Sequence, residues 1–190
     1  MSSLKVGFAL TGSFCTFERA FEAIEKLVVK GYEVTPIASF NAYNISTRFG
    51  TCEQNRRRLE ILTDKKIIAT IEDAEPIGPK NMFDILCVAP CTSNTMAKIA
   101  TGVNDTPVTM AVKSHARNQK PIVIAVSTND ALAAAGKNIG ALQNTKNYYF
   151  VPYSQDNPIS KPYSMVADFD LLEETLTLAL QGKQIQPMVK

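Results

Sequence analysis

The sequence contains a single histidine, and this scarcity restricts the acid–base chemistry open to the chain. His115 lies near the end of a predicted helix, beside Lys113 and Arg117, where the helix dipole favours cationic side chains. In that position it forms no convincing Ser-His-Asp or Cys-His pair, and no paired carboxylates follow the predicted strands. The sequence therefore argues against the enzyme classes that depend on those groups.

Cysteine is also sparse, and its spacing does not suit a metal. The only close pair is separated by three residues, unlike a zinc-binding or redox Cys-X-X-Cys motif; the four residues are Cys15, Cys52, Cys87 and Cys91. We therefore expect reduced thiols and no metal site. Cys15 is the functional candidate among them, because a helix N-terminus lowers the pKa of a thiol.

Long apolar runs and an excess of either charge are missing too. No run approaches the roughly 18 apolar residues that span a bilayer. The start MSSLKVGFAL has one lysine and a polar break at Thr11, which predicts no signal peptide and a cytoplasmic protein. A formal net charge of +2 favours neither nucleic acid nor an anionic membrane as a partner.

What the chain does have is an alternation of short apolar runs and helical patterns along its 190 residues. We expect strands at 4–10, 32–38, 66–71, 83–90, 121–127 and 147–153, helices at 16–30, 53–64, 92–102, 105–119, 130–143 and 168–182, and a loop at 154–164. Such apolar strands predict a parallel sheet covered on both faces. The expected fold is α/β, doubly wound and three-layered, in one domain of residues 1–190 on which the segment of about 152–183 packs.

Polar residues follow the first predicted strand, where ligands bind in doubly wound sheets. The turn Thr11-Gly12-Ser13, with Thr16 one turn later, is neither a GxGxxG motif nor a P-loop. Gly12 permits a tight turn, and the hydroxyls at a helix N-terminus suit a phosphate. Helix capping by Ser13 or Thr16 explains the same residues, so both interpretations remain open.

The strand at 83–90 is followed by the richest polar cluster in the chain. It exceeds what one helix cap needs and lies beside the expected switch point of the sheet; its members are Thr92, Ser93, Asn94 and Thr95. This surplus of polar groups is the strongest local indication of a ligand site.

Other polar candidates are less specific. Ser39 follows the second strand and suits a ribityl or ribose hydroxyl, or a turn cap. Of Asn129 and Asp130, after the strand at 121–127, one is expected to cap the next helix and the other to face a ligand. Arg56 belongs to an arginine run on a helix, where a solvated face or a contact between subunits is favoured over a carboxylate clamp.

Together, TGSFCTF, APCTSNTMAKIATGVNDT and STND resemble the flavoprotein family of homo-oligomeric FMN-binding cysteine decarboxylases, from the first strand to about residue 145. The resemblance implies a flavodoxin-like, Rossmann-like fold with FMN as cofactor, and a trimer or a multiple of it with flavin sites at the boundaries between subunits. It assigns the FMN phosphate to Gly12, Ser13 and Thr16, the flavin tail to Ser39, and the ribityl chain and ring to Ala89, Thr92, Ser93, Asn94 and Thr95.

Two departures from this family argue against decarboxylation. The family's catalytic histidine precedes the central strand, and Pro76 stands at about its place in EPIGPKNMFD. The family's PAMN substrate motif becomes VSTNDAL, which keeps Asn129 but loses the proline and the methionines. We therefore do not expect decarboxylation of a cysteine substrate.

A second resemblance covers the whole chain. GSFCTF, STNDALAAAGKNIG, NPISKPYSMVADF and the VPY-QDNP loop are similar to one component of a two-component synthase in this family, from spore-forming bacteria. That enzyme oxidises a dihydropyridine dicarboxylate to an aromatic pyridine dicarboxylate. The resemblance implies a partner similar to a nicotinamide-dependent dehydrogenase, with NADP on it, and an oxidoreductase subunit of the mother-cell cytoplasm that is inactive alone.

A substrate with two carboxylates favours nearby cations and amide groups. Asn129, Lys113 and Arg56 are the candidate contacts, and Lys161 is a further one, although each also suits a surface role. The motifs assign no catalytic residue. Two other functions remain open: a binding or scaffolding subunit that uses no flavin, and an FMN-dependent decarboxylase of a cysteinyl substrate.

Overall fold

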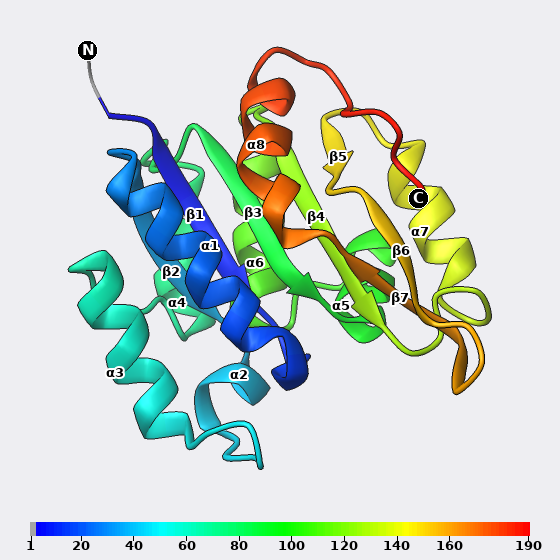
Figure 1. Ribbon diagram of the computed structural model, residues 1–190. Helices are drawn as coiled ribbons and strands as arrows, with labels where there is room; N and C mark the ends of the chain where they lie inside the picture. The colour runs from blue at the N-terminus through cyan, green and yellow to red at the C-terminus, as the bar shows by residue number, and fades with distance from the viewer. Residues whose placement is uncertain (1–2) are drawn as a thin grey trace.

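The computed structural model describes residues 3–190; Met1 and Ser2, the start of the segment from which no signal peptide was predicted, lie outside that range. The chain forms a mixed, seven-stranded sheet with helices on both faces (Figure 1). Its parallel part has the order β2-β1-β3-β4-β5, made of β2 (Glu33–Ala38), β1 (Lys5–Leu10), β3 (Ile85–Cys91), β4 (Ile122–Thr128) and β5 (Tyr148–Phe150). This order is flavodoxin-like, with the switch point between β1 and β3.

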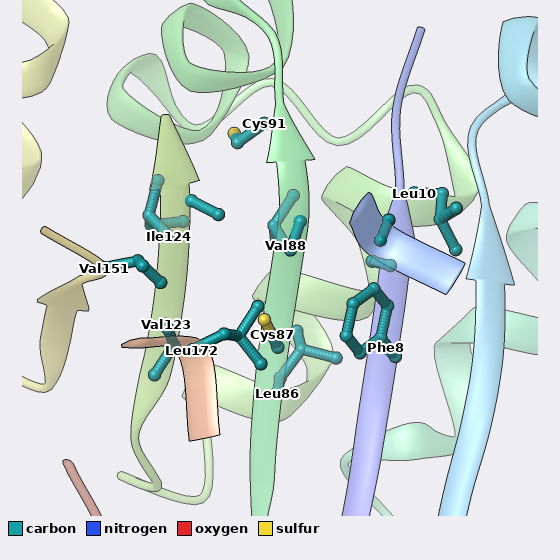
Figure 2. Close-up of a cluster of buried hydrophobic side chains, with 14 of the residues drawn as sticks. Phe8, Leu10, Leu86, Cys87, Val88, Cys91, Val123, Ile124, Val151 and Leu172 are labelled. Carbon is teal, nitrogen blue, oxygen red and sulfur yellow. The ribbon is translucent and has the colours of Figure 1, made fainter. Parts of the chain in front are cut away.

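The parallel strands form from apolar runs that are buried on both faces. Every residue of β3 is buried, as expected for a central parallel strand. Figure 2 shows such side chains on three neighbouring strands, among them the fully buried Phe8, Val88 and Ile124. Val88 and Ile124 are register partners across β3 and β4, so the pairing of the strands places these two core residues side by side.

Helices cover both faces of the sheet (Figure 1). One face carries α1 (Phe17–Val29) and α8 (Leu172–Leu180), and the other carries α4 (Ile71–Ala74), α5 (Ser93–Thr101), α6 (Pro107–Ala116) and α7 (Gly136–Gln143), while α3 (Cys52–Thr63) flanks α1. In α1 the apolar side chains recur every three or four residues and face the core. The helix ends before Gly31, whose φ of 88° only glycine adopts easily. No helix within residues 3–190 is long and apolar enough to cross a membrane.

The expected loop at 154–164 is instead an antiparallel hairpin of β6 (Tyr153–Asn157) and β7 (Lys161–Ala167), so the sheet is not purely parallel. The turn-forming residues that suggested a loop make the tip, where Asn157 Oδ1 accepts hydrogen bonds from the amides of Ile159 and Ser160. Polar residues and Pro162 hid the strand pattern on either side of this tip.

Two other expected elements differ. The segment 66–71 is not a strand of the sheet: Ile68 makes an isolated bridge to Ile37, and Thr70 then caps α4 by accepting a hydrogen bond from the amide of Asp73. The helix expected from residue 130 begins only at Gly136, because the preceding residues form turns closed on the carbonyl of Asp130.

One edge of β4 is shared by two strands. Its first half, Ile122–Ile124, pairs with β5, whereas Ser127 and Thr128 at its end pair antiparallel with β7. The hairpin is thereby attached to the carboxyl end of the sheet, which is the edge where a ligand is expected.

Candidate functional site

A cavity of about 710 Å³ lies at the carboxyl ends of β1, β3 and β4. Its walls are the turn after β1, a second turn at 47–49, the start of α5, the residues after β4, and the β6–β7 hairpin. Its volume falls within the range of about 300–1,000 Å³ that is usual for small-molecule sites.

A hydroxyl network joins two strands that are not neighbours in the sheet. Ser13 follows β1 and Ser127 ends β4, and their Oγ atoms lie 2.7 Å apart although β3 separates the two strands. Thr16 supports this contact from behind, because its hydroxyl donates to the carbonyl oxygen of Ser13 at 2.8 Å and lies 3.4 Å from Ser127 Oγ. The turn after β1 therefore reaches past β3 to β4.

Backbone N–H groups are available beside these hydroxyls. The amides of Phe14 and Cys15, which open the helical segment after Ser13, have no acceptor within residues 3–190. Thr92 is the N-cap residue of α5, but its side chain accepts no capping hydrogen bond: its hydroxyl lies 3.2 Å from Thr95 Oγ1, and its amide donates to Thr11 Oγ1. Both helix starts can thus present N–H groups to an anion or a polar chain.

The structure brings several of the predicted site residues together. Gly12, Ser13, Thr92, Ser93 and Asn129 line the cavity. Asn94 lines an adjoining hollow of about 460 Å³ that shares Ser93 and Asp130 with the cavity.

The remaining predicted flavin contacts do not line the cavity. Thr16 and Thr95 are buried behind it, Ala89 is buried within β3, and Ser39 caps the short helix α2 (Phe40–Asn44) by accepting a hydrogen bond from the amide of Ala42. Their contacts with a flavin stay predictions.

Two of the predicted substrate contacts also lie outside the cavity wall. Arg56 stacks over the ring of Tyr43 at 4.6 Å and lies 3.6 Å from Glu53, and Lys113 is exposed on α6. Lys161, by contrast, does line the cavity, and its Nζ lies 2.5 Å from Asp156.

Sequence reasoning missed Arg48 and Phe49, which line the cavity from the second turn. The segment that holds them has neither helical nor strand periodicity. Gly50, which has a φ of 137°, is its one sequence signal, because a glycine there marks a tight turn.

His115 is buried on α6 and is not part of the cavity wall. Its Nε2 donates to the carbonyl oxygen of Pro121 at 3.1 Å, and burial lowers its pKa to about 4. The histidine is therefore a structural group rather than an acid or base of the site. Within residues 3–190, no group of three or more His, Cys, Asp or Glu side chains is placed to hold a metal ion.

This buried histidine predicts acid sensitivity. Its pKa of about 4 in the folded chain is below the ordinary value of 6.5, so the unfolded chain binds the extra proton first as the pH falls. From pH 7 to pH 5 the free energy of unfolding is expected to fall by about 2 kcal/mol more in the wild type than in His115→Gln, whose amide can still donate to Pro121. Urea denaturation at both pH values measures this, and equal pH dependence in the two proteins would contradict it.

Known proteins share the sequence and the fold of this chain. The Flavoprotein family model matches residues 1–171. The chain is 47% identical to the B subunit of dipicolinate synthase from Bacillus subtilis over 192 residues, which cover 100% of this chain and 96% of that protein. The crystal structure of the corresponding B subunit from Bacillus halodurans C has a TM-score of 0.91 at 41% identity, covering 100% of this chain and 97% of the other.

A more distant structure shares only the fold: the FMN-dependent cysteine decarboxylase SpaF has a TM-score of 0.71 at 22% identity, with 94% of this chain and 95% of that chain covered. Both resemblances seen in the sequence are confirmed. The two-component synthase is dipicolinate synthase, and the component that this chain resembles is its B subunit. The chain belongs to the Flavoprotein family.

Proposed function

We propose that this chain is the B subunit of a dipicolinate synthase, which acts with a dehydrogenase-like partner, the A subunit, to oxidise dihydrodipicolinate to dipicolinate during sporulation. The full-length identity of 47% to the Bacillus subtilis protein carries this proposal. The oxidation takes a hydride and a proton from the ring, so the complex needs a hydride acceptor. NADP on the dehydrogenase-like partner and FMN on this chain are the two acceptors proposed, and the mother-cell cytoplasm is the proposed location.

The cavity fits FMN by its chemistry. Ser13 Oγ and the free amides of Phe14 and Cys15 are proposed to bind the phosphate, and Ser93 at the start of α5 to face the ribityl chain. The FMN dependence of SpaF, which has the same fold, supports this cofactor. When bound, FMN would supply a two-electron acceptor; the chain's own groups bind and orient it. The family resemblance adds Gly12, Thr16, Ser39, Ala89, Thr92, Asn94 and Thr95 as proposed contacts.

We further propose a homo-oligomer, a trimer or a multiple of it. Large apolar side chains are exposed after β4 and on the β6–β7 hairpin: Leu132 is 53% exposed, Tyr163 56% and Ile159 95%. Leu132 and Tyr163 are adjacent, because the amide of Leu132 donates to the carbonyl oxygen of Tyr163 at 3.1 Å. Burial of such a surface against another copy of the chain would stabilise the assembly.

Reconstitution tests the catalytic role. Dihydrodipicolinate and NADP are supplied to this chain, to the dehydrogenase-like partner and to both together, with and without FMN, and dipicolinate is measured by its ultraviolet absorbance. We expect dipicolinate from the complete mixture and none from this chain alone. Turnover by the dehydrogenase-like partner alone at the rate of the complete mixture would contradict a catalytic role for this chain.

A non-catalytic binding or scaffolding subunit is the second candidate. This candidate is favoured because both carboxylates of the cavity already have partners within the chain. Asp130 Oδ1 accepts a hydrogen bond from Thr128 at 2.5 Å, and Asp156 forms an ion pair with Lys161. A visible spectrum separates the candidates, since protein with oxidised FMN is yellow. A colourless protein whose complex is fully active without FMN would favour the scaffold.

Decarboxylation is the least supported function. Pro76 stands about where the family's decarboxylases have their catalytic histidine, and His115 lies outside the cavity wall. Release of carbon dioxide from a cysteinyl substrate by the FMN-loaded chain would support decarboxylation as the function.

A further inference from the structure

A tight turn holds Arg48 and Phe49 at the cavity. The amide of Thr47 donates to the carbonyl oxygen of Gly50 at 3.0 Å, and the amide of Gly50 donates back to Thr47 at 3.1 Å. Phe49 N–H also donates to Thr47 Oγ1 at 3.1 Å. Arg48 and Phe49 are therefore the two tip residues of a closed turn, and both line the cavity.

The base of this turn is anchored to α3. Ser46 Oγ accepts a hydrogen bond from the amide of Cys52 at 3.0 Å, and Thr51 and Gln54 form a capping box at the first turn of the helix. The backbone of these two exposed tip residues is thus positioned before any ligand arrives, which reduces the entropy lost on binding.

Arg48 is the cation of the cavity that lacks a carboxylate partner. The other cation, Lys161, is paired with Asp156. Arg48 has no ion-pair partner within residues 3–190; its guanidinium lies over the ring of Phe49, 4.8 Å from the centroid. A cation–π contact holds the guanidinium near the ring and leaves its N–H groups free for an anion.

We propose that Arg48 binds a carboxylate of the ring dicarboxylate, with Phe49 holding the guanidinium in place. The inference rests on the proposed function for the identity of that dicarboxylate. A planar guanidinium matches a carboxylate with two parallel hydrogen bonds, which a lysine ammonium cannot reproduce. The turn after β1 already offers a hydroxyl and free amides to a phosphate, so the cation on the separate 47–50 turn is left for a second anionic group.

Isothermal titration of the purified full chain with dipicolinate, and separately with FMN, tests this assignment. The variants are Arg48→Gln and, as a matched control, Arg57→Gln, an exposed arginine on α3 that is not part of the cavity wall. Loss of a charge-assisted pair is expected to weaken dipicolinate binding about tenfold or more in Arg48→Gln. Binding in Arg57→Gln, and FMN binding in both variants, should equal the wild type.

Several outcomes overturn the assignment. Equal dipicolinate affinity in Arg48→Gln and wild type does so, as does a wild-type chain that binds no dipicolinate. A loss confined to FMN would assign Arg48 to the cofactor phosphate instead. Thermal unfolding of each variant shows whether the fold is kept. Arg48-dependent dipicolinate binding by a chain that binds no FMN, or that is inactive with the dehydrogenase-like partner, would sustain the inference while the proposed function fails.

Discussion

Replacing Ser13 by aspartate is expected to lower the affinity for FMN by about 100-fold or more. Ser13 lines the cavity, and its Oγ lies 2.7 Å from Ser127 Oγ. A carboxylate at this position would face the proposed phosphate, and two like charges about 4 Å apart repel by about 4 kcal/mol near a protein surface. Flavin fluorescence during titration measures the affinity.

Ser13→Ala is the matched control for this variant. It removes one hydroxyl and adds no charge, so we expect about a tenfold loss of FMN affinity at most. The melting temperature of each variant shows whether the turn still folds. If Ser13→Asp bound FMN as tightly as the wild type, the phosphate would have to bind elsewhere, and the proposed orientation of the cofactor would be wrong.

The second large effect concerns stability. Gly78→Ala is expected to lower the free energy of unfolding by about 3 kcal/mol or more. A Cβ on Gly78 would lie 2.1 Å from the carbonyl oxygen of Ser114, a backbone atom that cannot rotate away. The clash would also disturb the hydrogen bond from the Gly78 amide to Ser114 Oγ, which is 2.8 Å long and ties the segment before β3 to α6.

Gly140→Ala is the matched control. This glycine lies inside α7, where a Cβ would meet no atom within 4 Å, so alanine should raise the free energy of unfolding by about 0.5–1 kcal/mol. Chemical denaturation of both variants measures the two changes. Similar stability of Gly78→Ala and wild type would mean that α6 can move away from the segment before β3.

The central strands and α1 were predictable from the sequence because their patterns are local. β3 and β4 are continuous apolar runs, and α1 has a helical period closed by Gly31. The β6–β7 hairpin was not predictable, since its attachment to β4 depends on pairing between Thr128 and Met165, residues distant in sequence. The same holds for 66–71, where three isoleucines gave a strand pattern but only Ile68 makes a bridge.

The candidate site divides in the same way. The polar turns at 11–13 and 92–95 were predicted because a parallel sheet brings the ends of its strands to one edge. The contact between Ser13 and Ser127 was not, since strand order cannot show that a turn reaches past a neighbouring strand. Arg48 escaped prediction because a turn, rather than a periodic pattern, sets its position.

The sharing of the β4 edge also bears on aggregation. Without β7, the end of β4 at Ser127 and Thr128 would offer unpaired backbone groups to a strand from another molecule. The hairpin covers them and makes β6 the outermost strand, whose exposed residues Gln155, Asp156 and Asn157 are polar and one is charged. A polar edge strand of this kind is a poor template for intermolecular strand pairing. Deleting the hairpin would expose the end of β4 and leave the protein prone to self-association, and it would also remove Lys161 from the cavity.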